Sequence, residues 1–156
     1  MSAQEVAALR LEREFDASPE EVFDAWTNPE VLQRWWAPTP TGSSPGCDVD
    51  LRVGGTYTLR MRAVDGGQVN SVAGEFREID RPRRLVYTWC WEADSGMHPG
   101  LVTLVTVDFI ELGGRTRVVL EHTGLGSEES RQRHGEGWNG AFDNLGTRIF
   151  GTRAGG

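Results

Sequence analysis

The sequence predicts an α+β domain in which a curved antiparallel sheet is covered by one long helix near the C-terminus. Three observations lead to this prediction. Apolar and polar side chains alternate over seven short segments, which is typical of strands with one buried face. Turn sequences and one longer loop join six of these segments in succession, and strands joined by short turns run antiparallel. The last part of the chain instead carries an apolar stripe at helical spacing.

The chain has 156 residues, which is the usual size of one domain. We expect a single domain over residues 1–156, with an ordered core at about residues 8–152. No apolar run approaches the ~18 residues that a membrane span needs, and the start lacks the apolar core of a secretory signal. We therefore expect a cytoplasmic protein without a membrane span. The net charge of −7 argues against a nucleic-acid partner, because phosphate binding needs a basic surface.

The first strand is expected at Leu9–Phe15, where side chains alternate between the two faces of the sheet. Ser18 and Glu21 follow with the spacing of a capping box, so a helix begins at this point. Asn28 and Pro29 repeat the pattern of a capping residue followed by proline. The sequence therefore predicts two short helices that lie back to back directly after the first strand.

The middle of the chain is predicted to form the rest of the sheet. A loop without periodicity covers residues 37–46. The six strands that follow it are expected at Cys47–Val53, Tyr57–Met61, Val72–Phe76, Leu85–Trp91, Thr103–Phe109 and Val118–His122. The turns and the loop that separate them are expected at Asp65-Gly66-Gly67, Asp80–Arg83, Ala93–Gly100 and Gly113-Gly114.

The C-terminal segment is predicted to form one long helix. Ser127 is a suitable N-cap, and Glu128 and Glu129 favour the start of a helix. One apolar stripe then runs along Trp138, Phe142, Leu145 and Ile149. Each glycine lowers helix stability by up to ~1 kcal/mol, so the helix is either loosely packed at its start or closely approached by another segment. These glycines are Gly135, Gly137, Gly140 and Gly146, and a frayed tail is expected at residues 154–156.

Large aromatic side chains occupy inward-facing positions of the predicted strands, opposite a helix that carries glycines. This combination predicts a cavity for a hydrophobic ligand, because side chains must otherwise fill the space inside a curved sheet. The second short helix, which ends at Trp35 and Trp36, would act as its lid. The alternative is that the same side chains simply fill the core. The residues expected to line the cavity are Trp26, Trp35, Trp36, Leu59, Met61, Phe76, Tyr87, Trp89, Trp91, Val107, Phe109, His122, Trp138, Phe142 and Leu145.

Two polar residues, His122 and Arg13, fall on inward-facing positions. His122 would be a general base, a group that orients a ligand carbonyl or, as we favour, a core histidine with a backbone or hydroxyl partner. Arg13 needs a partner because an unpaired buried charge is costly. That partner would be an anionic ligand group or an acid at the cavity mouth. Because Asp48, Asp50 and Asp108 alternate outward and no nucleophile motif is present, we expect no catalytic residues.

Metals and cofactors have little support in the sequence. Cys47 and Cys90 are the two cysteines of the chain, and neither belongs to a CxxC motif. The three histidines lie far from them in sequence, whereas a zinc site needs several ligands at short spacing. We therefore expect no metal, no cofactor and two unpaired thiols.

Several segments of the chain resemble a known family. These segments are Ala17–Glu30, Trp35–Pro38, Asp50–Gly55, Gly74–Phe76, Arg84–Trp89, Thr116–Leu125, and Gly137-Trp138 with Leu145. They resemble the activator-of-heat-shock-protein-90-ATPase-like family, within the START/birch-pollen-allergen-like (SRPBCC) superfamily. The resemblance implies the helix-grip fold, in which a seven-stranded curved antiparallel sheet wraps around a long C-terminal helix and two short helices close the other side. It also implies a cavity for hydrophobic or amphipathic small molecules.

In the helix-grip strand order we expect the strand of Cys47 to lie beside the first and third strands. The strand of Cys90 is expected further across the sheet. A disulfide needs Cα atoms within about 7 Å of each other, so we expect none between these two residues.

A fold of this kind hosts several functions, so the resemblance alone does not select one. Our leading prediction is a soluble binding protein for a small hydrophobic or aromatic ligand, without catalytic activity. The first alternative is a polyketide cyclase-like or hydrolase-like enzyme that uses the same cavity. The second is a co-chaperone-like module that binds a protein partner. A monomer and a homodimer are both compatible with the sequence.

Overall fold

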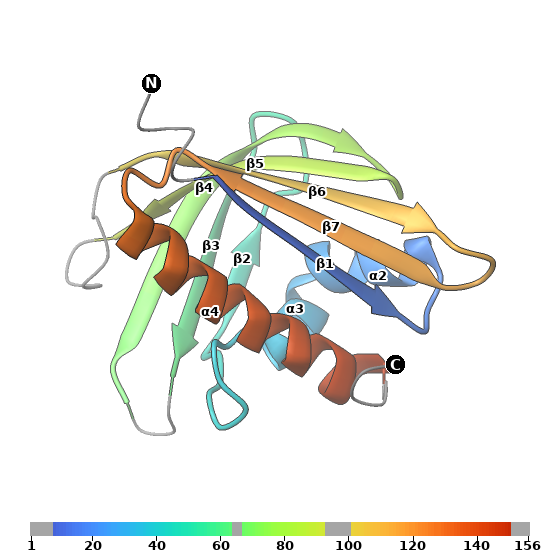
Figure 1. Ribbon diagram of the computed structural model, residues 1–156, viewed down its shortest axis with the longest axis horizontal. Helices are drawn as coiled ribbons and strands as arrows, with labels where there is room; N and C mark the ends of the chain where they lie inside the picture. Colours follow the sequence, from blue (N-terminus) through green and yellow to red (C-terminus); the bar gives the residue numbers. More distant parts are fainter. Residues whose placement is uncertain (1–7, 64–66, 93–100, 151–156) are drawn as a thin grey trace.

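The computed structural model describes residues 8–63, 67–92 and 101–150. Its strands and helices follow one another in the predicted order (Figure 1). They are β1 (Leu9–Phe15), α2 (Pro19–Thr27), α3 (Pro29–Trp35), β2 (Cys47–Val49), β3 (Thr56–Arg62), β4 (Val69–Asp80), β5 (Arg84–Trp91), β6 (Thr103–Glu111), β7 (Thr116–Thr123), α4 (Glu128–Asn144) and the π-helix η1 (Leu145–Phe150). The turn at residues 65–66, the loop at 93–100 and the tail at 154–156 lie outside the described residues.

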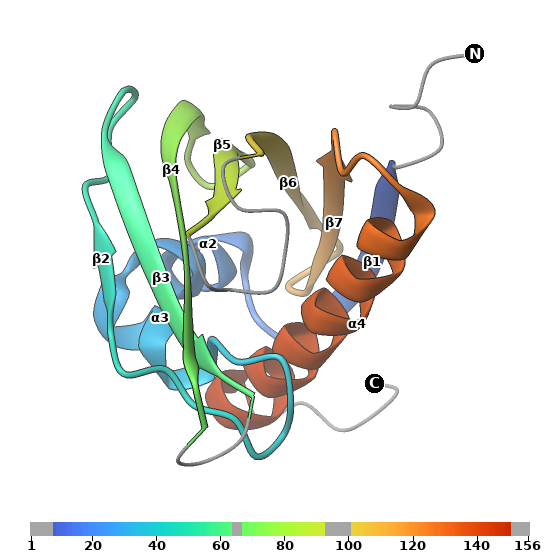
Figure 2. The ribbon, with the colours of Figure 1, turned by 90° about the vertical axis from the view of Figure 1, so that its left-hand side faces the viewer.

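The seven strands form one antiparallel sheet in the order β1-β7-β6-β5-β4-β3-β2. The sheet curves around α4, while α2 and α3 lie at one end of its concave side (Figure 2). This confirms the predicted α+β class and the helix-grip arrangement. The strands expected from Tyr57 onward all lie within β3 to β7. No helix among the described residues is long and apolar enough to cross a membrane.

The prediction that the Cys47 strand lies between the first and third strands is correct for the third strand and wrong for the first. β2 pairs with β3, as predicted, but β1 lies at the opposite edge of the sheet and pairs with β7. The reason is that α2 and α3 carry the chain from one sheet edge to the other, so strands consecutive in sequence become the two outermost. Cys47 and Cys90 are free thiols, and the whole of β3 and β4 lies between their strands.

The strand predicted at Cys47–Val53 is shorter than expected, because β2 ends at Val49. The chain turns back beyond this point, where the Asp50 N–H donates to the Thr56 carbonyl at 2.9 Å. Gly54 sits in this turn with φ +85, a left-handed conformation that favours glycine. The alternating side chains predicted that the strand continues to Val53. The hydrogen bond from Asp50 to Thr56 instead closes a turn, which leads the chain back into β3.

The capping residues predicted from sequence start α2 and α3. The Glu21 N–H donates to Ser18 Oγ at 3.2 Å, and the Ser18 N–H donates to the Glu21 carboxylate at 3.1 Å, so the capping box is complete. Asn28 Oδ1 accepts from the Glu30 N–H at 3.0 Å, which starts the second helix directly after the first.

The predicted single C-terminal helix is wrong at its last turns. α4 ends at Asn144, and the chain continues through η1 as a wider π-helical turn. The Asn144 side-chain amide donates to the Ala37 and Thr39 carbonyls at 3.1 and 2.9 Å. These two hydrogen bonds connect the end of α4 to the loop after α3. Since Leu145 remains buried in the wider turn, apolar periodicity alone does not reveal the change in helix type.

Of the two explanations for the glycines of this helix, close approach applies at Gly140. A Cβ at Gly140 would lie 1.9 Å from the Pro38 carbonyl oxygen, so only glycine lets the loop and α4 come this close. At Gly137, one turn earlier, the nearest atom to an added Cβ is Pro38 Cβ at 4.0 Å. The loop after α3 therefore packs directly on the middle of α4 and forms one side of the interior.

Candidate functional site

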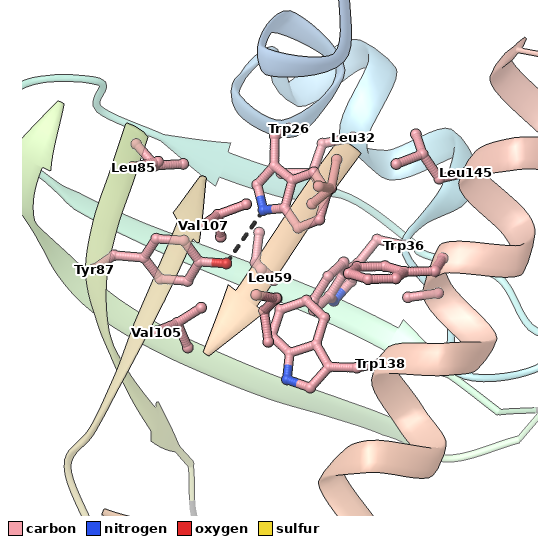
Figure 3. Packing of buried hydrophobic residues seen from close by; sticks show 14 of the residues in the cluster. Trp26, Leu32, Trp36, Leu59, Leu85, Tyr87, Val105, Val107, Trp138 and Leu145 are labelled. Carbon is pink, nitrogen blue, oxygen red and sulfur yellow. Dashed lines mark hydrogen bonds between the residues drawn. The ribbon is translucent and has the colours of Figure 1, made fainter. Parts of the chain in front are cut away.

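A cavity of about 410 Å³ lies between the inner face of β3 to β5, the loop after α3 and the middle of α4. Tryptophan dominates its wall. Figure 3 shows Trp138 projecting from α4 toward the sheet, and its ring centroid lies 5.3 Å from that of Trp36. The predicted residues that line the cavity are Trp36, Met61, Trp89, Trp91 and Trp138. Those that the prediction missed are Ala37, Pro38, Thr39, Ala63, Asn70, Arg133, His134, Glu136, Gly137 and Ala141.

The other predicted residues lie elsewhere in the interior. Trp26, Leu59, Phe76 and Tyr87 surround a second hollow of only about 20 Å³, together with neighbouring apolar side chains. The rest are buried in the core and line neither space; they are Trp35, Val107, Phe109, His122, Phe142 and Leu145. Side-chain parity identified the inner face correctly, but it did not separate the residues that fill this face from those that border the cavity.

Trp26 and Trp35 are core residues with satisfied indole groups. Trp26 Nε1 donates to the Tyr87 hydroxyl at 3.2 Å (Figure 3), and Trp35 Nε1 donates to the Ala25 carbonyl at 3.0 Å. Burial raises the pKa of Tyr87, so its hydroxyl keeps its proton. Trp35 is completely buried and is not part of a lid, whereas Trp36 does border the cavity.

His134 is the most informative residue that the sequence analysis missed. It is buried in α4, and its Nε2 accepts from Trp91 Nε1 at 2.9 Å. Its Nδ1 lies 2.8 Å from the Ser130 carbonyl, so Nδ1 carries the proton and donates it. Its position four residues before Trp138 places both side chains on one helix face, which was the available signal.

His122 takes part in a chain of hydrogen bonds with fixed directions. An indole N–H can only donate, so His122 Nδ1 accepts from Trp138 Nε1 at 3.1 Å. His122 Nε2 then donates to Thr103 Oγ1 at 2.7 Å, and that hydroxyl donates to the Trp89 carbonyl at 3.0 Å. Burial, together with nearby His134, holds the pKa of His122 well below its usual value. His122 is therefore a neutral core histidine, and both of its ring nitrogens are engaged.

Two tryptophans of the wall differ from the others. Trp36 Nε1 and Trp89 Nε1 are buried and have no hydrogen-bond acceptor among the described residues, although the indoles of Trp91 and Trp138 are both paired with histidine. Asn70 Oδ1, from β4, likewise has no donor among these residues. These three atoms have almost no accessible surface, so the wall presents mainly the apolar faces of its aromatic rings to the cavity.

Among the described residues of the wall, Arg133 and Glu136 carry charges of opposite sign, and both are exposed. Within residues 8–63, 67–92 and 101–150, no three His, Cys, Asp or Glu side chains are grouped as they would be in a metal site.

Arg13 was expected to bind either an anionic ligand group or an acidic side chain at the cavity mouth. Its partner is an acidic side chain, Asp143, but this residue does not lie at the cavity. Arg13 Nη1 donates to Asp143 Oδ1 at 2.7 Å, and Nη2 donates to Asn139 Oδ1 at 3.3 Å. The guanidinium also lies 5.7 Å from the centroid of the Phe142 ring. None of these residues lines the cavity. Arg13 therefore joins β1 to α4 and is not placed to hold a ligand.

Replacing Asp143 with asparagine should lower the free energy of unfolding by only ~0.2–1 kcal/mol, because this ion pair is partly exposed to solvent. Urea denaturation followed by circular dichroism measures the effect. Asp48→Asn is the matched control, since Asp48 forms a similarly exposed pair with Arg60 on another part of the sheet. A loss above ~2 kcal/mol for Asp143→Asn alone would contradict this role for Arg13.

Comparison with known proteins agrees with this fold. A family model for activator of Hsp90 ATPase homolog 1-like protein matches residues 16–149. The AHSA1 protein from Silicibacter pomeroyi is similar in structure, with 30% identity, a TM-score of 0.79, and 92% of this chain and 97% of that chain covered. A protein from Chromobacterium violaceum has 26% identity, a TM-score of 0.77 and coverage of 90% and 95%.

CalU16 from Micromonospora echinospora shares 30% identity at a TM-score of 0.66, and the match covers 91% of this chain and 75% of that chain. No curated protein matches this chain. The family match extends from the end of β1 through β7 and α4 and includes every residue that lines the cavity. The chain therefore belongs to the activator of Hsp90 ATPase homolog 1-like family, within the SRPBCC superfamily.

Proposed function

We propose that this protein binds a small hydrophobic or aromatic molecule in the cavity between the sheet and α4. The observation that carries the proposal is a cavity of about 410 Å³ with four tryptophans in its wall. Pockets for small molecules typically measure ~300–1,000 Å³ and are mostly apolar with a few polar groups. Burying an apolar ligand there is favourable by roughly 25 cal/mol for each Å² removed from water.

The wall is also held in place before any ligand arrives, which favours binding because less ordering is needed. His134 and His122 fix the rings of Trp91 and Trp138 through hydrogen bonds of 2.9 and 3.1 Å. On the opposite side, the contact between Gly140 and the Pro38 carbonyl fixes the loop that follows α3.

Binding without catalysis is supported over the enzyme alternative. A cyclase-like or hydrolase-like enzyme would need an acid–base group in contact with its substrate. His122 does not line the cavity, and His122 and His134 each use their acceptor nitrogen for an indole N–H. Glu136, the carboxylate described in the wall, is exposed to solvent and is not enclosed with the tryptophans. The alternative of a protein-interaction module rests on the family match and not on a particular surface of the described residues.

The test is a titration of the protein with 1-aminoanthracene, followed by quenching of tryptophan fluorescence. We expect saturable quenching at one site per chain, because four of the six tryptophans border the cavity. Gly137→Phe places a ring in the cavity and should abolish this quenching. Gln132→Phe adds the same ring to an exposed position of α4 and serves as the matched control. Quenching that is not saturable in the wild type, or that survives Gly137→Phe, would overturn the proposal.

A further inference from the structure

The cavity is followed by a second hollow of about 20 Å³, and among the described residues Trp36 alone borders both. Inward-facing side chains two residues apart on one strand divide between the two spaces. On β3, Met61 borders the cavity and Leu59 borders the second hollow. On β5, Trp89 borders the cavity and Tyr87 borders the second hollow. Because alternate residues of a strand share one face, the two spaces follow one another along the same inner face of the sheet.

Trp36 lies at the boundary between the two spaces. Its backbone is fixed at the end of α3, where its N–H donates to the Leu32 carbonyl at 3.0 Å. Its ring is buried, and the ring centroid lies 5.3 Å from that of Trp138 (Figure 3) and 5.8 Å from that of Trp89. Trp36 Nε1 has no hydrogen-bond partner among the described residues, so packing alone holds the ring in this position.

The wall of the second hollow is almost entirely apolar. Its two tyrosine hydroxyls are both engaged, since Tyr57 donates to the Thr88 carbonyl and Tyr87 accepts from Trp26 Nε1 at 3.2 Å. The other side chains of this wall are aliphatic or aromatic. A space of about 20 Å³ accommodates about one water-sized group, so this hollow can hold part of a ligand only as an extension of the cavity.

From this arrangement we infer that Trp36 limits the length of the ligand, and that the site takes compact aromatic molecules that end at its ring. The inference rests on the proposed function and names a specificity-determining residue of the same cavity. A longer molecule would have to extend past Trp36 into the second hollow, which the buried ring prevents. Removing the ring joins the two spaces and should admit elongated aromatic molecules with an alkyl end.

The test measures length with 4-amino-4′-alkylbiphenyls whose unbranched chains are lengthened one CH₂ group at a time, starting from the unsubstituted biphenyl. The biphenyl is rigid and cannot fold back, and its amino group favours the exposed part of the wall at Arg133 and Glu136. Dissociation constants are measured by displacement of 1-aminoanthracene. Each added CH₂ group should lower the dissociation constant by up to about fourfold until the chain reaches Trp36, and further groups should then give no gain.

Trp36→Leu replaces the ring with a smaller apolar side chain and should extend this gain by about two CH₂ groups or more. The longest biphenyl should then bind about tenfold more tightly, relative to the unsubstituted one, than in the wild type. Trp36→Leu/Leu85→Phe refills the second hollow, because Leu85 borders that hollow and not the cavity, and should restore the wild-type limit. Each value is a ratio of two probes on one variant whose fold is checked by circular dichroism, so a general change in affinity cancels.

The indole ¹⁵N–¹H signal of Trp26 gives a readout that does not depend on affinity, because Trp26 borders the second hollow and not the cavity. The variant Trp26→Phe assigns this signal. In Trp36→Leu saturated with each biphenyl, the signal should move with chain length as the chain end reaches the hydrogen bond between Trp26 and Tyr87. In the wild type it should not depend on chain length. Trp91→Leu is the matched control, since it removes the same volume from a part of the wall that does not border the second hollow.

The outcomes separate this inference from the proposed function. A length limit that moves outward in Trp36→Leu and returns in the double variant supports the inference. The inference is overturned, while the binding function stands, if wild-type affinity rises through the whole series, if Trp36→Leu keeps the wild-type limit, or if the double variant keeps the longer one. It is also overturned if no biphenyl displaces bound 1-aminoanthracene, or if the Trp26 signal follows chain length equally in the wild type or in Trp91→Leu. If 1-aminoanthracene itself does not bind to the folded protein, the proposed function falls and the inference falls with it.

Discussion

Replacing Gly140 with alanine should destabilise the protein by about 3 kcal/mol, because the added Cβ would overlap with backbone that cannot move aside. The Cβ would lie 1.9 Å from the carbonyl oxygen and 2.5 Å from the carbonyl carbon of Pro38. The neighbours of Pro38 are themselves held, since the Asn144 amide bonds the Ala37 and Thr39 carbonyls. Urea denaturation followed by tryptophan fluorescence and circular dichroism measures the loss.

Gly137→Ala is the control for this prediction, and it should change the free energy of unfolding in the opposite direction. The nearest atom to its Cβ is Pro38 Cβ at 4.0 Å, so nothing prevents the substitution. Alanine is a better helix former than glycine, and the free energy of unfolding should therefore rise by up to ~1 kcal/mol. If Gly140→Ala were as stable as Gly137→Ala, the loop after α3 would not pack against α4 as described.

The protein should lose stability as the pH falls below about 6.5, the ordinary pKa of histidine. His122 has a lowered pKa in the folded state because it is buried, with His134 as its titratable neighbour at a ring-centroid distance of 5.0 Å. Below pH 6.5 the unfolded chain takes up a proton at this position and the folded protein does not. The unfolded state is therefore favoured as the pH falls, at up to ~1.4 kcal/mol per pH unit.

Chemical denaturation at several pH values between 5 and 7.5 measures this slope. His122→Asn is the informative variant, because the asparagine oxygen can still accept from Trp138 Nε1 but does not titrate. The variant should be less stable at pH 7.5 and should lose less stability than the wild type as the pH falls. An unchanged slope would show that His122 is not the group responsible.

Features set by local sequence could be predicted for this fold. The caps at Ser18 and Asn28 depend on residues two or three positions away, so their hydrogen bonds follow from the sequence pattern. Strand parity likewise placed Tyr87, Trp89 and Trp91 on the buried face of β5, because side chains alternate strictly along a strand. The general position of the cavity followed from this parity together with the stripe on α4.

Features set by contacts between distant segments could not be predicted in the same way. The position of β2 depends on where α2 and α3 carry the chain, which alternation does not encode. The cavity wall depends on how closely the Pro38 loop approaches Gly140, and this approach determines which inner-face side chains border open space. The distinction between Trp91 and Trp89 requires the hydrogen-bond partner of each indole, and for Trp91 that partner lies in a different element.

The pairing of β1 with β7 also determines when the molecule can be completed during its synthesis. Leu9 pairs with His122, so the first strand leaves the ribosome long before its partner exists. At ~5–20 residues per second, that interval is roughly 6–23 seconds. Trp138 and His134 are made later still, and both belong to the cavity wall. A growing chain therefore has an unpaired first strand and an incomplete cavity until almost the whole sequence has been translated.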